Sequence, residues 1–327
     1  MQKTPVWLDC DPGHDDAMAI ILAGYNPSLK LLGVSTIGGN QMLSKVTQNA
    51  LDVLDSIGLS HIMVAKGQQN PILRPIQLCP EIHGDSGLDS LEKGRPLFPR
   101  STRNPVSDKA VLTMYKVLTD AHASYKAKVK LICTGPMTNA ALLLTLFPEV
   151  KESIDLVFMG GAIGVGNTNP VAEFNMEVDP EASKIVFQSG VDLTMVPLEV
   201  THTLLVTPRV LSEIEGERPT PFRAAIQQLL LYFATSYKAV FNFEHPPLHD
   251  PAAVAFVIAP QLFKYNAMRV EIEVASPISA GQTVCDVWGK SKLPKNCKVC
   301  TAVDVDAFWD LMVGAVAAAD AHSPMNA

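Results

Sequence analysis

The sequence lacks any uncharged apolar run of the roughly 18 residues that a membrane-spanning helix needs, although 47% of its 327 residues are hydrophobic. Its first residues, MQKTPVWLDCDP, bring charge and proline before any hydrophobic run, which is not the pattern of a secretory signal. These absences predict a soluble intracellular protein with no membrane partner, most simply a cytoplasmic one, with an organelle as the alternative. The length and composition suffice to bury a large core.

Clusters of basic residues are also missing. The chain has 26 basic and 33 acidic residues, a net charge of -7, and no basic-aromatic interleaving, so we expect no nucleic-acid partner. Cysteine is scarce: six residues spread over this length do not form a disulfide framework. Cys297 and Cys300 make one C-x-x-C pair, but no second pair completes a zinc site, so two ordinary strand cysteines are expected.

Short apolar runs alternate with longer amphipathic segments. This alternation predicts an α/β fold: an open, mostly parallel, Rossmann-like sheet with helices on both faces, additional C-terminal strands and one domain over 1–327. The expected strands are 6–8, 31–36, 62–65, 130–133, 156–159 and 193–196, with extra strands at 269–274 and 298–304 flanking the main sheet. The first expected helix begins near Gly13. The other expected helices are 43–57, 108–125, 138–146, 180–188, 221–240, 251–258 and 305–319.

The loops that follow the expected strands carry the polar residues. Each places glycine beside Asp, Asn, Thr or Glu, in the segments DCDPGHDD, TIGGNQ, TGPMTN, GGAIGVGNTNPVAEFN and LEVTH. In an open parallel sheet, ligands bind outside the carboxyl ends of the strands. We therefore expect these loops to converge on one polar site that is rich in oxygen.

Four carboxylates lie within eight residues in the first loop, at Asp9, Asp11, Asp15 and Asp16. The last two suit the first turn of a helix, where the helix dipole favours anions, but this leaves Asp9 and Asp11 unexplained. A cation among the four would relieve their repulsion. Oxygen ligands favour Ca²⁺ or Mg²⁺ over zinc.

Calcium needs more oxygens than this loop supplies. One candidate source is Asp250, which stands at the start of another expected helix. A main-chain carbonyl near Thr134, in the CTGP turn, is a second candidate.

Several amides and one carboxylate are spaced along a glycine-rich loop, at Asn167, Asn169, Glu173 and Asn175. They can hydrogen-bond to several hydroxyls of one sugar, although turn chemistry favours the same residue types. Asn40, which follows two glycines, is likewise either a sugar-binding residue or an ordinary turn residue.

Two histidines lie near these candidate ligands. His83 is in the segment EIHGDSG, and His249 directly precedes Asp250. Either can act as a general acid near neutral pH, although a histidine is more often structural.

The segment DCDPGHDDAMAI, with its D-x-D-x-x-x-D-D spacing, resembles the N-terminal signature of the calcium-dependent nucleoside hydrolases, which split ribonucleosides into ribose and free base. The segments TIGGNQ, CTGPMTN, MGGAIGVGNTNPVAEFNMEVDPEA and LHDPAAVA resemble further motifs of that family in the same order. The resemblance extends from Val6 to about Trp309. The histidine before Asp250 resembles the inosine-uridine-preferring branch and its trypanosomatid inosine-guanosine-preferring relatives.

The resemblance implies a role for each matching residue. Asp11, Asp16, Asp250 and the carbonyl of Thr134 are the implied calcium ligands. Asp11 is also the implied general base for a calcium-bound water, and His249 is the expected proton donor to the base. The implied ribose and base contacts are Asp15, Asn40, His83, Met159, Asn167, Glu173, Asn175 and Asp250. Asp9 supports the loop, and the expected assembly is a homodimer or homotetramer.

The expected substrates are purine-leaning, with inosine and guanosine foremost. Some purine-specific members of the family hold the base between tryptophans, but Trp7, Trp288 and Trp309 lie outside the loops expected to contact the base, so we do not expect such a sandwich here. The segment YKAVFNFEHPPLHD departs from the branch, with Phe241, Phe243 and His245 available to reshape the base pocket, and this departure weighs against pyrimidine cleavage. Two alternatives remain open. One is a metal-dependent phosphohydrolase with Asp9 as nucleophile, which would want a lysine at a later strand end. The other is a ribonucleoside-binding protein without turnover, which would not need Asp11 as a base.

Overall fold

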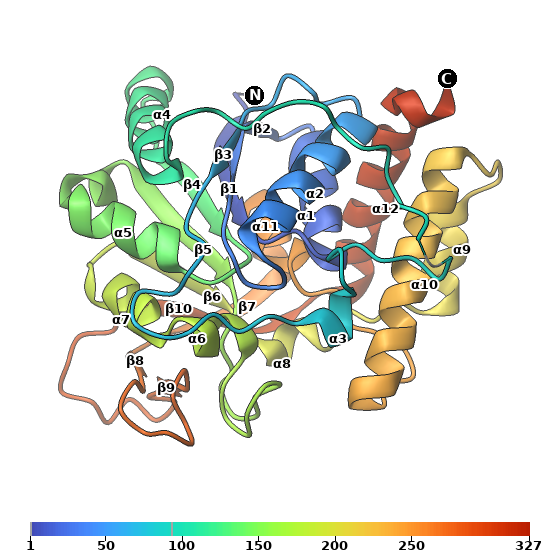
Figure 1. The fold of residues 1–327 in the computed structure, drawn as a ribbon. Helices are drawn as coiled ribbons and strands as arrows, with labels where there is room; N and C mark the ends of the chain where they lie inside the picture. The colour runs from blue at the N-terminus through green and yellow to red at the C-terminus, as the bar shows by residue number, and fades with distance from the viewer. Residues whose placement is uncertain (1, 93) are drawn as a thin grey trace.

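The computed structural model describes residues 2–92 and 94–327, and an eight-stranded sheet lies at its centre (Figure 1). The strand order is β3-β2-β1-β4-β5-β6-β10-β7, and every neighbouring pair is parallel except β10 and β7. The strands are β1 (Thr4–Cys10), β2 (Leu29–Thr36), β3 (Val64–Lys66), β4 (Val129–Cys133), β5 (Ile154–Met159), β6 (Asp192–Val196), β7 (Phe263–Met268) and β10 (Cys297–Val303). A separate antiparallel pair joins β8 (Val270–Ile272) and β9 (Thr283–Cys285).

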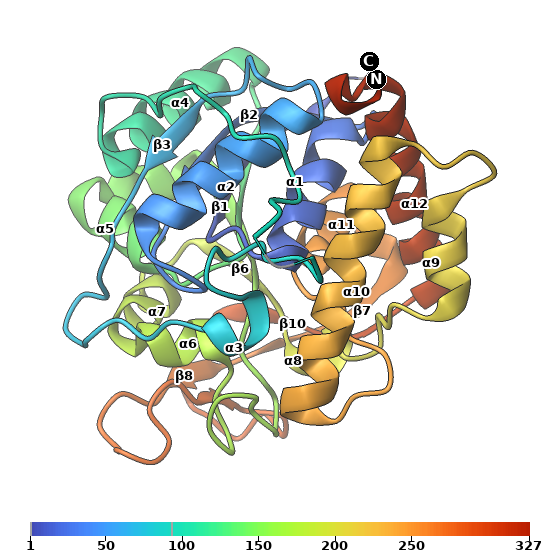
Figure 2. The same ribbon diagram turned by 45° about the vertical axis from the view of Figure 1, so that its right-hand side comes forward.

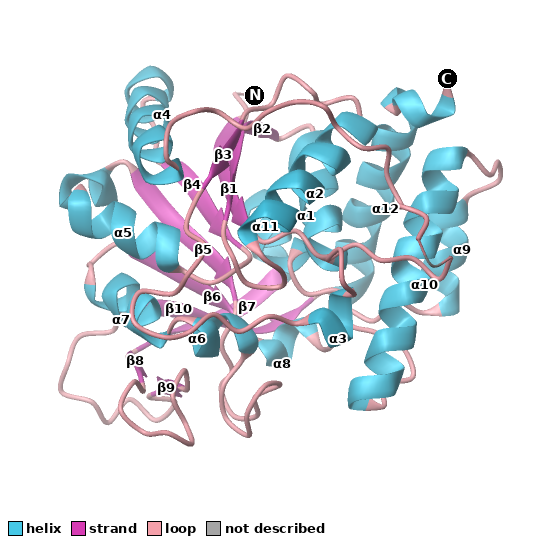
Figure 3. Ribbon diagram, in the orientation of Figure 1, coloured by secondary structure: helices cyan, strands magenta, loops and turns pink. Residues whose placement is uncertain are grey.

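Helices cover both faces of the sheet (Figures 2 and 3). One face carries α4 (Ala110–Tyr125), α5 (Thr138–Leu146) and α7 (Pro180–Gln188), and the other carries α1 (His14–Tyr25), α2 (Leu43–Ser56), α11 (Pro251–Ile258) and α12 (Val305–His322). The long α10 (Pro221–Phe241) and α9 (Pro208–Glu215) lie outside the second layer. Short helices follow several strands: α3 (Pro80–His83), α6 (Phe174–Val178) and α8 (Leu198–Thr201).

The apolar strands explain this layered arrangement. β1 and β4 each present apolar side chains to both faces, as strands of a covered parallel sheet do. Two separate hydrophobic clusters result: Leu8 lies in the one that packs against α1, α11 and α12, whereas Trp7 lies in the one that packs against α4 and α5. Both side chains are fully buried.

Several helices begin at capping residues that the sequence supplies. The side chains of Asp179, Thr220 and Asp304 each accept a backbone N–H three residues later, at the starts of α7, α10 and α12. Pro180 and Pro221 occupy the first positions of α7 and α10, where the missing proline N–H costs nothing.

The strand order reverses at β1, because β2 and β3 lie on one side of it and β4 to β6 on the other. Asp9 at the end of β1 is paired with Cys133 at the end of β4. Ligands of open α/β sheets bind at such a reversal, outside the carboxyl ends of the strands. The loops after β1 and β4 therefore meet where a site is expected.

The predicted parallel α/β architecture is confirmed, and every predicted strand and helix overlaps an observed one. The extra strand expected at 298–304 is β10, but it does not flank the sheet: it pairs in parallel with β6. The strands β7 and β9 and the helices α3, α6, α8 and α9 were not predicted. Cys297 and Cys300 lie buried in β10 as free thiols. Among the described residues, no helix is both long and apolar enough to cross a membrane.

Candidate active site

A cavity of about 560 Å³ lies at the carboxyl edge of the sheet. Ten of the residues that the sequence singled out line it: Asp15, Asn40, His83, Thr134, Met159, Asn167, Glu173, Asn175, His249 and Asp250. These residues lie more than 200 positions apart in the sequence, from Asp15 to Asp250. The strand-end loops therefore converge on one cavity, as the sequence predicted. Four of the other candidate residues do not line it: Asp9, Asp11, Asp16 and Asn169. Asp11 and Asp16 are hydrogen-bonded to residues that do, whereas the side-chain oxygen of Asn169 accepts the N–H groups of Val171 and Ala172 within its own loop.

Asp16 connects three loops behind the cavity. One carboxylate oxygen accepts the N–H of Gly13 at 3.0 Å and the amide of Asn40 at 3.1 Å. The other oxygen accepts the hydroxyl of Thr134 at 2.8 Å and the N–H of Asp11 at 3.3 Å. The loops after β1, β2 and β4 are therefore held together by one carboxylate.

Asp11 has one engaged and one free carboxylate oxygen. Its Oδ2 accepts the backbone N–H of Asn40 at 2.6 Å, whereas its buried Oδ1 has no hydrogen-bond partner among the described residues. A Cβ at Gly39 would lie 2.2 Å from Oδ2, and one at Gly135 would lie 2.4 Å from Oδ1, so both positions need glycine. Burial, followed by the charge of Asp16, raises the pKa of Asp11 well above its ordinary value.

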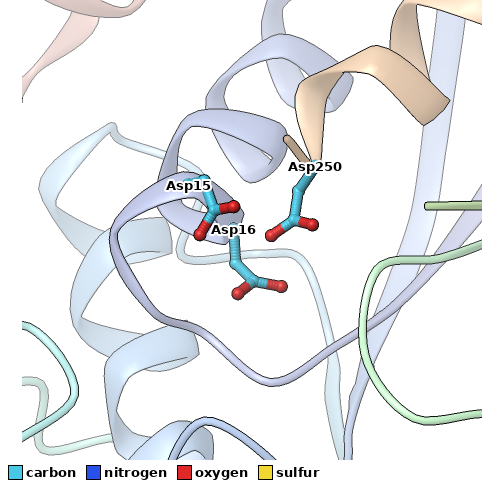
Figure 4. Close-up of side chains that lie close together, drawn as sticks. All are labelled: Asp15, Asp16 and Asp250. Atoms are coloured by element: carbon cyan, nitrogen blue, oxygen red, sulfur yellow. The ribbon is translucent and has the colours of Figure 1, made fainter. Parts of the chain in front are cut away.

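Asp15, Asp16 and Asp250 form a buried carboxylate cluster, with one oxygen from each lying within 4.8 Å of the others (Figure 4). The first turn of α1 supplies two of them, and the start of α11 supplies the third. Burial, and then the charge of Asp16, raises the pKa of Asp15 from 3.8 to about 7. Within residues 2–92 and 94–327, no lysine or arginine lines the cavity to balance this charge.

Asn175 joins the loop after β4 to the loop after β5. Its side-chain amide donates to the carbonyl oxygen of Thr134 at 2.8 Å and to that of Met159 at 3.3 Å. A carbonyl oxygen has two lone pairs. The Thr134 carbonyl therefore keeps one for a further ligand.

Glu173 and Asn167 lie on the loop between β5 and α6. The Glu173 carboxylate caps α6 by accepting the N–H of Asn175 at 2.9 Å, and it also accepts that of Gly161 at 3.0 Å. Burial raises its pKa to about 7. The side-chain oxygen of Asn167, Oδ1, accepts the backbone N–H of Phe174 at 2.9 Å. This leaves the side-chain NH₂ of Asn167 to donate to a ligand.

His249 is held between two hydroxyl groups on the opposite wall. Its Nδ1 lies 2.8 Å from the hydroxyl of Thr201, and its Nε2 lies 2.7 Å from that of Tyr237. Burial, together with the nearby His202, keeps the pKa of His249 well below its ordinary value. The ring is therefore neutral at physiological pH.

His83 is seated on the loop after β1. The backbone N–H of His14 donates to its Nδ1 at 3.2 Å, and its ring stacks on Phe233. A Cβ at Gly13 would lie 2.4 Å from the same Nδ1, so glycine makes room for the ring. Burial lowers the pKa of His83 well below its ordinary value.

The cavity has walls that the sequence did not reveal. Tyr237 lines it and contacts His249, yet the sequence singled out only its neighbour Phe241, four residues on in α10. That spacing places both side chains on one face of a helix and was the available signal. Cys79 and Ile82, around α3, complete this side.

Asp9 does not line the cavity. Its Oδ1 accepts hydrogen bonds from the hydroxyl of Ser35 and from the amide of Asn139, the latter at 2.8 Å. Burial raises its pKa to about 7. Neither Ser35 nor Asn139 lines the cavity, whereas Asp11 is bonded to the cavity residue Asn40, so Asp9 lies one contact farther from the site and a nucleophilic role is not supported.

The sequence is similar to those of several ribonucleoside hydrolases over almost its whole length. It is 45% identical over 322 residues to a "Probable ribonucleoside hydrolase" of Dictyostelium discoideum, covering 95% of this chain and 94% of the relative. It is 39% identical to the "Pyrimidine-specific ribonucleoside hydrolase RihA" of Shewanella oneidensis, covering 96% of each chain.

A solved structure, the "Purine-Preferring Ribonucleoside Hydrolase from Gardnerella vaginalis", superposes with a TM-score of 0.88 at 29% identity, covering 97% of this chain and 100% of that one. The sequence pattern of the family described as "Inosine-uridine preferring nucleoside hydrolase" matches residues 6–310. The chain therefore belongs to this nucleoside hydrolase family and is a ribonucleoside N-ribohydrolase.

Proposed function

We propose that the cavity binds a ribonucleoside with its ribose against the carboxylate cluster, and that Asp11 activates water to break the N-glycosidic bond with calcium as cofactor. One observation carries the proposal: the buried cluster of Asp15, Asp16 and Asp250 lies at the reversal of the sheet, against a cavity that is also lined by the side-chain amides of Asn40, Asn167 and Asn175. We also propose that residues 1–327 act as one domain, within a homodimer or homotetramer, as the family resemblance implies.

The residues present fit a calcium ion. The donors are all oxygens, as hard cations prefer, and the buried Oδ1 of Asp11 has no partner among the described residues. We assign Asp11, Asp16, Asp250 and the Thr134 carbonyl as the ligands. When bound, calcium would supply positive charge that binds ribose hydroxyls and lowers the pKa of the attacking water.

Asp11 is suited to take the proton of the attacking water. Its Oδ2 is fixed by the N–H of Asn40, so its orientation does not depend on the substrate. Its Oδ1 is buried beside Gly135 and has no hydrogen-bond partner among the described residues. A fixed carboxylate with one free oxygen is the arrangement that general-base catalysis requires.

The same carboxylates favour the transition state. Cleavage of the bond builds positive charge on the ribose ring, and preorganised negative groups stabilise that charge in a site from which water is excluded. We assign Asp15 and Asn175 to the 2′-hydroxyl, Asp250 to the 3′-hydroxyl, and Asn167 with Glu173 to the 5′-hydroxyl. Asn40 and Met159 complete the ribose pocket.

The departing base gains a proton from the opposite wall. His249 is the assigned donor, and the hydroxyl of Tyr237 against its Nε2 places both groups at the base side of the cavity. His83 is the second base-side contact. Because burial keeps the resting ring neutral, His249 acts as an acid by first taking up one proton from solvent and then giving that proton to the departing base. The ring thereby returns to its neutral form, with Nδ1 held by the hydroxyl of Thr201.

We propose that the preferred bases are purines, with inosine and guanosine foremost. An aromatic and histidine wall formed by Tyr237, Phe241, His83 and His249 supports this preference, because it can stack on and hydrogen-bond to a 6-oxopurine. Among the named relatives, one is called purine-preferring and one pyrimidine-specific.

The proposal is tested by measuring kcat/KM for inosine, guanosine, adenosine, uridine and cytidine, with and without a chelator. We expect ribose release to be fastest from inosine and guanosine. We also expect the chelator to lower every rate at least tenfold and added calcium to restore it. Faster cleavage of uridine would overturn the base preference alone, and undiminished activity after exhaustive chelation would overturn the calcium assignment.

Calcium is expected to stabilise the protein more as the pH rises. Because the pKa of folded Asp15 is raised from 3.8 to about 7, the metal-free fold binds more protons than the unfolded chain and loses stability as the pH rises from about 4 to 7. Burial also raises the pKa of the assigned ligands Asp11, Asp16 and Asp250, and calcium needs these carboxylates deprotonated. The difference in Tm with and without calcium should be roughly 5 °C at pH 7.5 and under half of that at pH 5. A pH-independent difference would contradict this linkage.

A further inference from the structure

Glu199 anchors the loop that connects β5 to α6. It lies in the first turn of α8, and its Oε1 accepts the backbone N–H of Ile163 at 2.9 Å and that of Gly164 at 2.8 Å. Its Oε2 is buried without a hydrogen-bond partner among the described residues. The side chain lies outside the cavity lining, so it does not belong to the site assigned above.

Thr283 holds the same loop from the other side. Its hydroxyl, on β9, accepts the N–H of Ala162 at 2.9 Å and donates to the carbonyl of Ala162 at 2.5 Å. Gly161 next to it has a φ of +74°, a conformation that favours glycine. Three consecutive residues, 162 to 164, are therefore tied to α8 and β9.

The loop needs these anchors because its tip is not packed. Val165 is 74% exposed, so hydrophobic contacts do not fix the tip. Asn167 follows two residues later and presents its amide to the cavity. Within the tip, the backbone N–H of Asn167 donates to the carbonyl of Ala172 at 3.1 Å, so the tip is a closed turn. The anchored backbone at 163 and 164 leads into this turn and thus helps to set where it lies over the cavity.

We propose that Glu199 is a positioning residue that sets the reach of Asn167 to the ribose 5′-hydroxyl. It thereby makes the enzyme selective for nucleosides that carry this hydroxyl over their 5′-deoxy analogues. This inference rests on the proposed function, in which Asn167 and Glu173 contact the 5′-hydroxyl. Neither Glu199 nor Thr283 touches the substrate.

The test compares inosine with 5′-deoxyinosine in the Glu199→Ala enzyme. We expect kcat/KM for inosine to fall about tenfold, the effect of losing one well-placed hydrogen bond, and kcat/KM for 5′-deoxyinosine to stay within about twofold. The selectivity ratio should therefore collapse. If the wild-type enzyme turns over the analogue too slowly, the two nucleosides are compared through their inhibition constants as competitors of p-nitrophenyl β-D-ribofuranoside cleavage.

Glu199→Gln is the matched control. Its amide oxygen can still accept both N–H groups, and its amide nitrogen replaces the oxygen that has no partner, so the selectivity should remain that of the wild type. Thr283→Val, which removes both bonds to Ala162, should lower selectivity in the same direction as Glu199→Ala.

Equal losses on both nucleosides in Glu199→Ala, or an unchanged ratio, would overturn the inference while leaving the proposed function intact. A wild-type enzyme that releases hypoxanthine from neither nucleoside would instead overturn the proposed function.

Discussion

The Asp11→Ala enzyme should turn over inosine at least ~10²-fold more slowly than the wild type, the low end for loss of a general base. Nucleoside binding should survive at saturating calcium, because Asp15, Asn167 and Asn175 still line the ribose side of the cavity. The expected pattern is therefore a fall in kcat with little change in affinity. Single-turnover kinetics, together with binding measured by calorimetry, separate these two quantities.

Asp11→Asn and Asp9→Asn form the matched pair for this experiment. Both aspartates are fully buried, and they lie two residues apart. Asn at 11 keeps the volume between Gly39 and Gly135 but removes the basic oxygen, so it should resemble Asp11→Ala. Asp9→Asn should lower the melting temperature, because it weakens the hydrogen bonds that the Asp9 carboxylate accepts from Ser35 and Asn139. It should leave kcat within a few fold of the wild-type value. Near-wild-type turnover by Asp11→Asn would remove Asp11 from the role of base.

The sequence predicted those parts of the fold that local patterns determine. The buried strands appear as uninterrupted apolar runs, and the helices α2, α5, α7 and α11 begin and end within about two residues of their expected bounds. The short helices α3, α6 and α8 span only one turn, in which no 3.6-residue periodicity can show. The strand β7 was missed because it is an edge strand whose four central residues are exposed, so its apolar content is low.

The candidate site was predictable to the extent that it follows strand ends. Asp15, Thr134 and Asn175 each belong to a polar loop after an apolar run, and a parallel sheet brings such loops to one edge. Tyr237 follows no strand and lies four residues before the end of α10, where an aromatic residue looks like an ordinary core position. Only the packing of α10 beside the start of α11 brings its hydroxyl to His249.

Contacts that fix orientation were likewise invisible in the sequence. Gly39 and Gly135 looked like turn glycines, but each is required because the carboxylate of Asp11 occupies the space of its missing Cβ. Glu199 was part of a strand-end motif without an assigned role, and its partners Ile163 and Gly164 lie about 35 residues earlier. Such long-range contacts depend on the tertiary fold and have no local pattern.

His249→Ala should slow inosine cleavage roughly 10²-fold, because the purine then departs without a positioned proton donor. The same variant should cleave p-nitrophenyl β-D-ribofuranoside within a few fold of the wild-type rate. Nitrophenolate is a stable anion and leaves without protonation, whereas the ribose contacts and Asp11 are unchanged. The comparison of the two substrates thus isolates the leaving-group step from water activation.

His202→Ala is the control, because this second histidine packs edge-on against His249 at 5.6 Å between ring centroids but does not line the cavity. The His202→Ala variant should leave the ratio of the cleavage rates of inosine and p-nitrophenyl β-D-ribofuranoside at the wild-type value. Tyr237→Phe removes only the hydroxyl at Nε2, so a loss on inosine alone would show that the hydroxyl takes part in proton delivery. If His249→Ala slows both substrates equally, His249 shapes the pocket and the proton comes from elsewhere, with His83 as the next residue to replace.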